Sequence, residues 1–147
     1  MYILDIKPWD CKLPVSKNFV LGEFVSSYNA YRKNVVEQFV YREDIFANIQ
    51  FLTETLLQPL RDAVGQPITI TSGYRCRMTN ILCGGAQNSL HLLGLAADIR
   101  CRCQHNKIVE LMQDMTFHEL IIYENRLHVS VKEAFNEKRI IRKAERI

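Results

Sequence analysis

Residues 89–101 read SLHLLGLAADIRC, an apolar stretch that contains His91 and Asp98. Along its second half, Ala97 and Ile99 fall on one side of an expected strand and Asp98 falls on the other. A carboxylate beside an apolar run needs a partner, because burying an unpaired charge is costly. Backbone hydrogen bonds in a loop would satisfy Asp98, and so would a metal ion shared with His91. The rest of the sequence distinguishes between these two interpretations.

The segment 119–131, ELIIYENRLHVSV, is typical of a β-hairpin with a tight turn at residues 124–126. In its second strand the apolar residues alternate with His128, which therefore points to the opposite side. A histidine opposite an apolar face looks into solvent or into a cleft, which favours a surface residue or a ligand over a histidine satisfied within the core. Imidazole and carboxylate groups suit zinc, and a catalytic zinc takes three protein ligands. His91, Asp98 and His128 are of the right types for such a set.

Two longer segments carry clear periodic patterns. Apolar residues recur at helical spacing from residue 43 to about 64, and Gly65 followed by Pro67 is a typical helix end. The following PITITSGYR alternates isoleucine and threonine, which predicts a half-buried strand that runs into a turn at Ser72 and Gly73. Shorter helices are expected at residues 78–83 and 106–115.

The two ends of the chain have weaker patterns. Residues 1–42 are expected to form an irregular arm packed on the core, with one short helix in NFVLGEF capped by Asn18. Residues from about 133 to 147 are expected to form a solvated tail or a last helix, because EKRIIRKAERI carries charges of both signs. Since no internal repeat or low-complexity linker is present, residues 1–147 are predicted to form a single domain.

The composition argues against several classes of protein. The chain has 147 residues, of which 48% are hydrophobic and 24% are charged, and its net charge is +3. These values are ordinary for a soluble globular protein. There is no basic stripe with interleaved aromatic residues, so we expect no nucleic-acid partner. No apolar stretch approaches the roughly 18 residues that span a bilayer, and no secretory signal is visible.

The cysteines are odd in number and irregularly spaced. Without an export signal, free thiols are the expected state. The residues concerned are Cys11, Cys76, Cys83, Cys101 and Cys103. The two close ones, in the order Cys-x-Cys, lack the spacing of a common zinc knuckle.

Three ordered motifs give the sequence a family resemblance. SGYRCRMTN at residues 72–80, GGAQNSLHLLGLAADI at 84–99 and LHVSV at 127–131 closely resemble the zinc D-alanyl-D-alanine peptidases. These are peptidoglycan carboxypeptidases and endopeptidases that share a fold with the Hedgehog signalling domain. NFVLGEF and LLQPLRDAVGQPITI extend the similarity over most of residues 18–131. The resemblance implies an α+β fold, with a small antiparallel sheet backed by helices and a zinc cleft on one sheet face. It also implies one Zn²⁺ per chain, held by His91, Asp98 and His128.

The resemblance further implies roles for residues around the metal. Arg75 matches an arginine that lies near the substrate or the transition-state oxyanion, the alternative being a salt bridge that holds the turn. Ser89 would hydrogen-bond the substrate or orient the ligand loop. Many relatives carry a catalytic glutamate three residues before the last histidine ligand, but here that position is Asn125, which cannot take a proton from water. Glu124 is therefore the first candidate for the general base, and Glu119 is the second.

The implied function is hydrolysis of peptide bonds in bacterial peptidoglycan stem peptides, as a carboxypeptidase or an endopeptidase. Zinc would acidify a water molecule and polarise the scissile carbonyl, with a glutamate taking up the proton and Arg75 assisting. We expect a monomeric phage or prophage enzyme, made in the cytoplasm and acting at the cell wall after release or as part of the virion. One alternative is a non-catalytic zinc or cell-wall-binding module of the same fold. The other is a thiol enzyme that uses Cys76 or Cys83 with a histidine.

Overall fold

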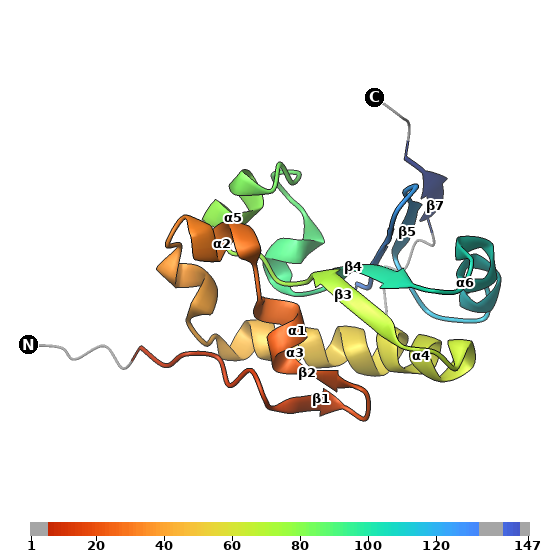
Figure 1. Ribbon diagram of the computed structural model, residues 1–147, viewed down its shortest axis with the longest axis horizontal. Helices are drawn as coiled ribbons and strands as arrows, with labels where there is room; N and C mark the ends of the chain where they lie inside the picture. Colours follow the sequence, from red (N-terminus) through yellow and green to blue (C-terminus); the bar gives the residue numbers. More distant parts are fainter. Residues whose placement is uncertain (1–5, 133–139, 145–147) are drawn as a thin grey trace, which may run out of the picture.

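A five-stranded sheet forms the centre of the computed structural model, which describes residues 6–132 and 140–144 (Figure 1). The strands are β3 (Ile68–Ser72), β4 (Ala96–Cys101), β5 (Glu119–Ile122), β6 (Leu127–Ser130) and β7 (Ile140–Lys143). They lie in the order β3-β4-β6-β5-β7, and every neighbouring pair is antiparallel except β5 and β7, which are parallel. The predicted α+β fold with a small antiparallel sheet is confirmed, with one parallel strand added at its edge.

One long helical segment packs beside this sheet. It comprises α3 (Glu43–Leu52), a π-helical turn η2 (Thr53–Leu57) and α4 (Gln58–Val64), which together match the predicted helix. The wide π turn comes just before Pro59, whose ring would clash with the carbonyl group four residues earlier in a regular α-helix. Gly65 ends the helix with a φ of 71°, in the left-handed region that glycine adopts readily.

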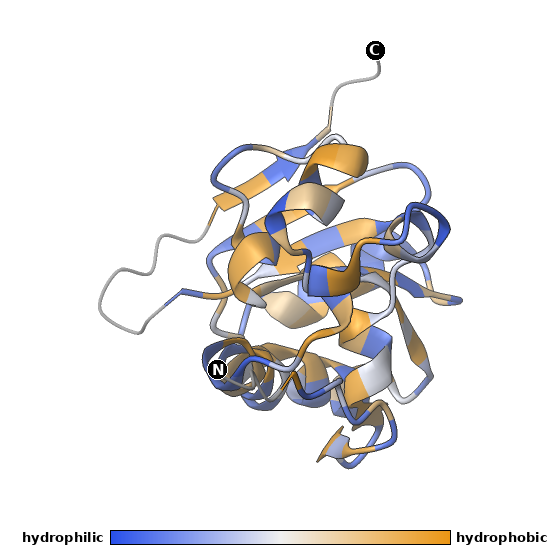
Figure 2. Cartoon of the chain, turned by 90° about the vertical axis from the view of Figure 1, so that its left-hand side faces the viewer, coloured by the Kyte–Doolittle hydropathy of each residue, from blue (hydrophilic) through white to orange (hydrophobic). Residues whose placement is uncertain are grey.

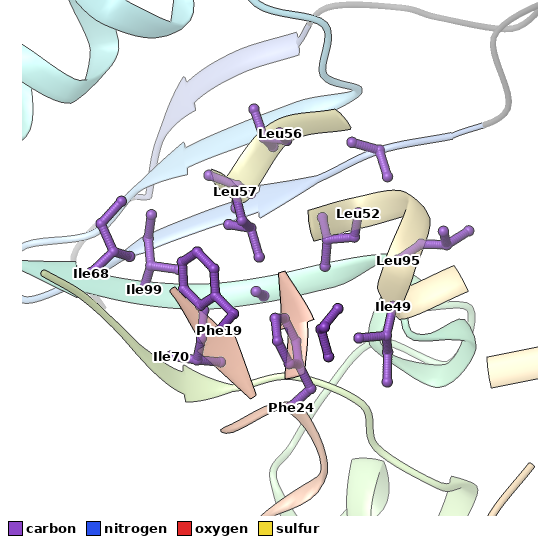
Figure 3. Packing of buried hydrophobic residues seen from close by; sticks show 14 of the residues in the cluster. Phe19, Phe24, Ile49, Leu52, Leu56, Leu57, Ile68, Ile70, Leu95 and Ile99 are labelled. Carbon is purple, nitrogen blue, oxygen red and sulfur yellow. The ribbon is translucent and has the colours of Figure 1, made fainter. Parts of the chain in front are cut away.

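The helix and the apolar face of the sheet build one core. Figure 3 shows Leu52, Leu56 and Leu57 of the helix in the same buried cluster as Ile99 of β4. Ala97 and Ile99 belong to this core cluster, so the predicted alternation along β4 is confirmed. Because side chains alternate across a strand, residue 98 projects from the other face of the sheet, away from the helix.

The remaining predicted helices are present with small shifts in their bounds. They are α5 (Arg77–Leu82) and α6 (His105–Met112), and a 3-10 turn η3 (Leu90–Leu93) leads into β4. In Figure 1, α6 lies beside α4. Within the described residues, no helix has the length and apolar character needed to cross a bilayer, and hydrophilic residues interrupt the hydrophobic ones along the chain (Figure 2).

The N-terminal segment has more regular structure than expected. Its elements are β1 (Pro14–Ser16), β2 (Phe19–Val20), α1 (Leu21–Val25), α2 (Tyr28–Arg32) and the 3-10 helix η1 (Val36–Phe39). The predicted cap at Asn18 is wrong, because α1 starts at Leu21 and the Glu23 carboxylate accepts a hydrogen bond from the N–H of Val20 at 2.8 Å. Asn18 instead pairs with Gln58 of α4, through its backbone N–H at 3.0 Å and its side-chain oxygen at 2.8 Å.

The C-terminal segment also departs from expectation at residues 140–143. These residues form β7 rather than a solvated tail or a helix, and all four are exposed. The strand is held by backbone hydrogen bonds to its neighbour, including one of 2.8 Å from the N–H of Ile140 to the carbonyl of His118. A strand that buries neither face leaves no alternation in its sequence, so the pattern could not reveal it. Residues 133–139 and 145–147 of the predicted tail lie outside the described residues.

Candidate metal centre

His91 is held by the loop that precedes β4. It lies in η3, and the hydroxyl of Ser89 accepts a hydrogen bond from its backbone N–H at 3.2 Å. Its ring Nδ1 lies 2.6 Å from the carbonyl oxygen of Gly73. Because a carbonyl only accepts hydrogen bonds, Nδ1 carries the proton, and Nε2 keeps its lone pair for a ligand role. That Nε2 atom faces Asp98 Oδ1 at 3.3 Å.

The register of the sheet brings Asp98 and His128 together. β4 and β6 run antiparallel with Asp98 directly opposite His128, and both side chains project from the face that the helix does not cover. His128 Nδ1 lies 3.0 Å from Asp98 Oδ1, and the rings of His91 and His128 have centroids 5.1 Å apart. His128 therefore looks into the site from the polar face, as its alternation with apolar residues indicated.

These three side chains converge closely enough to share one ion. Each of His91, Asp98 and His128 offers a ligand atom, and these atoms all lie within 4.8 Å of one another. These are the ligand types that zinc sites use. Two imidazole nitrogens and one carboxylate oxygen are suitable ligands for a borderline metal ion, and they lie close enough together to hold one.

Burial and hydrogen bonding favour the protonation states that bind a metal. Burial raises the pKa of Asp98, but the hydrogen bonds to His128 and His91 outweigh burial and hold that pKa well below its usual range. Burial lowers the pKa of His91, and the neighbouring carboxylate opposes this only in part. At neutral pH, Asp98 is ionised and His91 is uncharged, which are the forms in which both groups coordinate a metal.

Arg75 is fixed beside this cluster. Its Nε donates to Ser72 Oγ at 3.0 Å, and its two terminal nitrogens donate to Asn80 Oδ1 at 3.3 Å and to Asp98 Oδ2 at 3.4 Å. The backbone N–H of Arg75 also donates to the carbonyl of His91 at 3.0 Å. Only 12% of its side chain is exposed. The salt bridge considered as an alternative role is thus present, and it is made to a candidate metal ligand.

Gln38 supports this arrangement, although nothing in the sequence singled it out. Its buried side chain donates from Nε2 to the carbonyls of Val25 and Tyr74, both at 2.9 Å, and its Oε1 accepts from the N–H of Cys76 at 2.9 Å. The amide therefore fixes the backbone on both sides of Arg75. A single polar residue in a segment without periodicity gives no local sign that it will be buried, so sequence patterns could not find it.

The two candidates for the general base occupy different places. Glu119 is opposite Ser130 in the pairing of β5 with β6, so it projects from the same sheet face as His128. Its Oε1 lies 3.9 Å from His128 Nε2. Glu124 lies in the turn after β5 and is not among the described residues that line the cavity over the cluster. The structure brings Glu119 to the candidate centre and leaves Glu124 outside the cavity.

An open cavity of about 530 Å³ lies over the three candidate ligands. Arg75, Ser89 and Glu119 are among the residues that line it. The cavity wall also contains three basic residues that the sequence patterns did not single out, Arg126, Lys132 and Arg142. They lie in the hairpin turn, after β6 and in β7, where no motif pointed to the cavity.

Arg126 and Arg142 each approach an acidic group of the site. Arg126 Nε lies 3.7 Å from Asp98 Oδ2, and its guanidinium lies 3.9 Å from the centre of the Tyr123 ring. Arg142 Nε lies 3.2 Å from Glu119 Oε2. Each guanidinium therefore forms an ion pair with a carboxylate of the site and also lines the cavity.

Comparison with known families agrees with this geometry. A family model described as peptidase M15 matches residues 17–132, a range that contains all three candidate ligands. The chain belongs to the peptidase M15 family. M15 peptidases are metallo-enzymes, and the convergence of His91, Asp98 and His128 provides this chain with a group that could hold a metal. No curated protein matches the chain.

The M15 match covers most of the sheet but stops before its last strand. It starts just before β2 and ends just after β6, so it includes the long helix, the ligand loop and four of the five sheet strands. β7 lies beyond the matched residues, and with it the Arg142 that holds Glu119.

Proposed function

We propose that this M15 family member is a zinc-dependent peptidase that cleaves peptide bonds in bacterial peptidoglycan stem peptides. The observation that carries the proposal is the convergence of His91, Asp98 and His128 beneath an open cavity. A catalytic zinc typically has three protein ligands of these types and keeps a fourth position for water or substrate. When bound, the ion would supply a Lewis acid that polarises the scissile carbonyl and makes water more acidic.

Glu119 acts as the general base in this proposal. Its Oε1 lies 3.9 Å from the ring of His128, where it can take a proton from the attacking water and later pass it to the leaving amine. Its other oxygen, Oε2, pairs with Arg142. A carboxylate beside His128 favours the peptidase over the non-catalytic binding module. A binding module does not need a proton acceptor at that position.

Arg75 assists by stabilising negative charge. A guanidinium has five N–H donors, and three of its hydrogen bonds, to Ser72, Asn80 and Asp98, hold the group rigid. A remaining donor can point to the scissile oxygen as charge develops on it. Because the guanidinium is already fixed, little reorganisation is needed during the reaction. Ser89 acts through His91, whose backbone N–H it binds.

The charge of the cavity supports a substrate with free carboxylates. Its wall includes the guanidinium groups of Arg75, Arg126 and Arg142 and the ammonium group of Lys132. Its carboxylates, Asp98 and Glu119, are assigned here to the metal and to proton transfer. A cationic wall attracts an anionic ligand, and peptidoglycan stem peptides carry free carboxylates beside their amide bonds.

The direct test is digestion of purified peptidoglycan by the full chain, with products identified by mass. Zinc-loaded protein should release peptides or terminal residues, a chelator should abolish the release, and added zinc should restore it. His128→Ala, which removes one proposed ligand, should release nothing under the same conditions. If zinc-loaded wild type binds the wall without releasing any product, the chain is a binding module and the peptidase proposal is wrong.

A further inference from the structure

Two thiols meet at the end of β4. Cys101 Sγ and Cys103 Sγ lie 2.9 Å apart. Cys101 is the last residue of the strand, and the chain bends at residues 102–103, so that the N–H of Cys103 lies 3.4 Å from Cys101 Sγ. Both side chains are partly buried against the core. The fold, and not only the short spacing in sequence, holds these two sulfur atoms face to face.

The pair is separate from the candidate metal centre. Cys101 follows Ile99 by two residues and, like Ile99, packs with the core. Asp98 projects from the other face of the same strand, toward His91 and His128. The thiols and the candidate ligands are thus on opposite sides of β4, and a change at one does not require a change at the other.

We propose that Cys101 and Cys103 form a modification site, in which the two thiols close into an intramolecular disulfide by exchange with a low-molecular-weight disulfide such as oxidised glutathione. Closure shortens the 2.9 Å separation by about 0.9 Å to the roughly 2.05 Å of a disulfide bond. Cys103 lies beyond the last residue of the strand, so it can move by this amount without breaking the pairing of β4 with β3.

The exchange has a defined order. Burial and the hydrogen bond that it donates to Cys101 raise the pKa of Cys103 to about 11, so Cys103 keeps its proton longer. Cys101 attacks first, losing its proton to solvent, and a mixed disulfide forms between Cys101 Sγ and one sulfur of oxidised glutathione while the other glutathione leaves as a thiolate. Cys103 then loses its proton to solvent and attacks Cys101 Sγ, and the second glutathione leaves. Two protein thiols are oxidised, and one glutathione disulfide is reduced to two thiols.

The other three cysteines have different surroundings and serve as internal controls. Cys76 is buried, with its sulfur 3.3 Å from the hydroxyl of Thr79. Cys83 is exposed and accepts a hydrogen bond from Asn29 at 3.5 Å, and Cys11 is exposed. We expect the buried thiol to stay unmodified, and an exposed thiol can take up one glutathione as a mixed disulfide, which adds mass.

The test uses the full chain, reduced, freed of reductant and incubated in its native state with excess oxidised glutathione. Remaining thiols are then blocked with N-ethylmaleimide, and the intact mass and the tryptic peptides are measured. We expect Cys101 and Cys103 to lose their reactivity together without gaining glutathione, to appear as one disulfide-linked product, and to react again after dithiothreitol.

Single variants separate this result from ordinary thiol oxidation. Cys101→Ser and Cys103→Ser should each lose the linked product, and the remaining cysteine should carry a glutathione adduct instead. Cys83→Ser should form the linked product as the wild type does. Separate glutathione or maleimide adducts on Cys101 and Cys103 of the folded wild type would overturn the proposal. The mass measurements do not depend on peptidase activity. This proposal can therefore fail or succeed independently of the proposed function.

Discussion

Glu119 and His128 project from the same face of neighbouring strands, with Glu119 Oε1 3.9 Å from His128 Nε2. The pairing of β5 with β6 fixes this relationship, because Glu119 is opposite Ser130, two residues beyond the histidine. Strand pairing determines the sheet face from which the Glu119 side chain projects, whereas no such pairing orients Glu124 in the turn. This pairing is the reason to place Glu119 ahead of Glu124 as the proton acceptor.

The first prediction concerns these two glutamates. Glu119→Gln should retain zinc but lose at least about a hundredfold in the rate of peptidoglycan hydrolysis, since general-base assistance is worth about 10²–10⁴-fold. Glu124→Gln is the matched control, because it removes the same charge from the same hairpin, and it should keep a rate near that of the wild type. Initial rates of peptidoglycan hydrolysis at saturating zinc, measured for both variants and the wild type, test this prediction. A large loss in Glu124→Gln with little loss in Glu119→Gln would return the role to the turn.

The second prediction concerns metal binding. Asp98→Ala and His128→Ala should lose most of the roughly one zinc per chain expected of a catalytic site, because each removes one of three protein ligands. His105→Ala, a change at the start of α6 outside the candidate cluster, should bind zinc like the wild type. Elemental analysis after dialysis measures the content. Full zinc retention in folded Asp98→Ala and His128→Ala would refute the ligand assignment.

The third prediction concerns the substrate carboxylate. Arg126→Gln should raise the KM of a stem-peptide substrate with a free C-terminal carboxylate by about tenfold, or about 1.4 kcal/mol, because a charge-assisted hydrogen bond is lost. The KM of the corresponding C-terminal amide should change much less. Arg100→Gln, an exposed arginine that does not line the cavity, is the control. Equal changes in KM for acid and amide would rule out recognition of the carboxylate by Arg126.

The fourth prediction concerns the buried amide of Gln38. Gln38→Ala should lower the free energy of unfolding by about 2–4 kcal/mol, because it leaves a buried N–H and two buried carbonyl groups without their partner. Gln66→Ala, at an exposed position after the long helix, should change it by less than about 0.5 kcal/mol. Urea unfolding followed by circular dichroism gives both values. A small effect in Gln38→Ala would mean that the neighbouring backbone is satisfied in another way.

The fifth prediction concerns pH. Burial raises the pKa of Tyr74 in the folded state, whereas the unfolded chain has the ordinary value of about 10. Below that value, both states hold the proton and the stabilising contribution of Tyr74 is fully present. As the pH rises further, the unfolded state loses its proton first, so the stability falls until the folded pKa is passed.

Melting temperatures between about pH 9 and 11.5 measure this effect. Tyr74→Phe should lose stability less steeply than the wild type over this range, because phenylalanine does not ionise. Tyr28→Phe, which changes a tyrosine with 75% exposure, should follow the wild-type curve. Parallel curves for the wild type and Tyr74→Phe would contradict the prediction.

Local patterns were sufficient for much of the fold. The helical spacing before Gly65 predicts the long helix, and the alternation around Asp98 and His128 predicts which way both side chains face. Both patterns can be read from a few neighbouring residues, because the backbone geometry of a helix or strand sets how often its side chains return to the same face. The order of the motifs then identifies the family that the M15 match confirms.

Only the tertiary structure determines which residues from different elements meet. Glu119 rather than Glu124 reaches the cavity because of the register between β5 and β6, and Arg142 reaches Glu119 because β7 joins the sheet edge. Gln38 is buried because three other segments close around it. Register, edge pairing and burial at a distance depend on contacts between residues far apart in the chain, and such contacts leave no periodic trace in a single sequence.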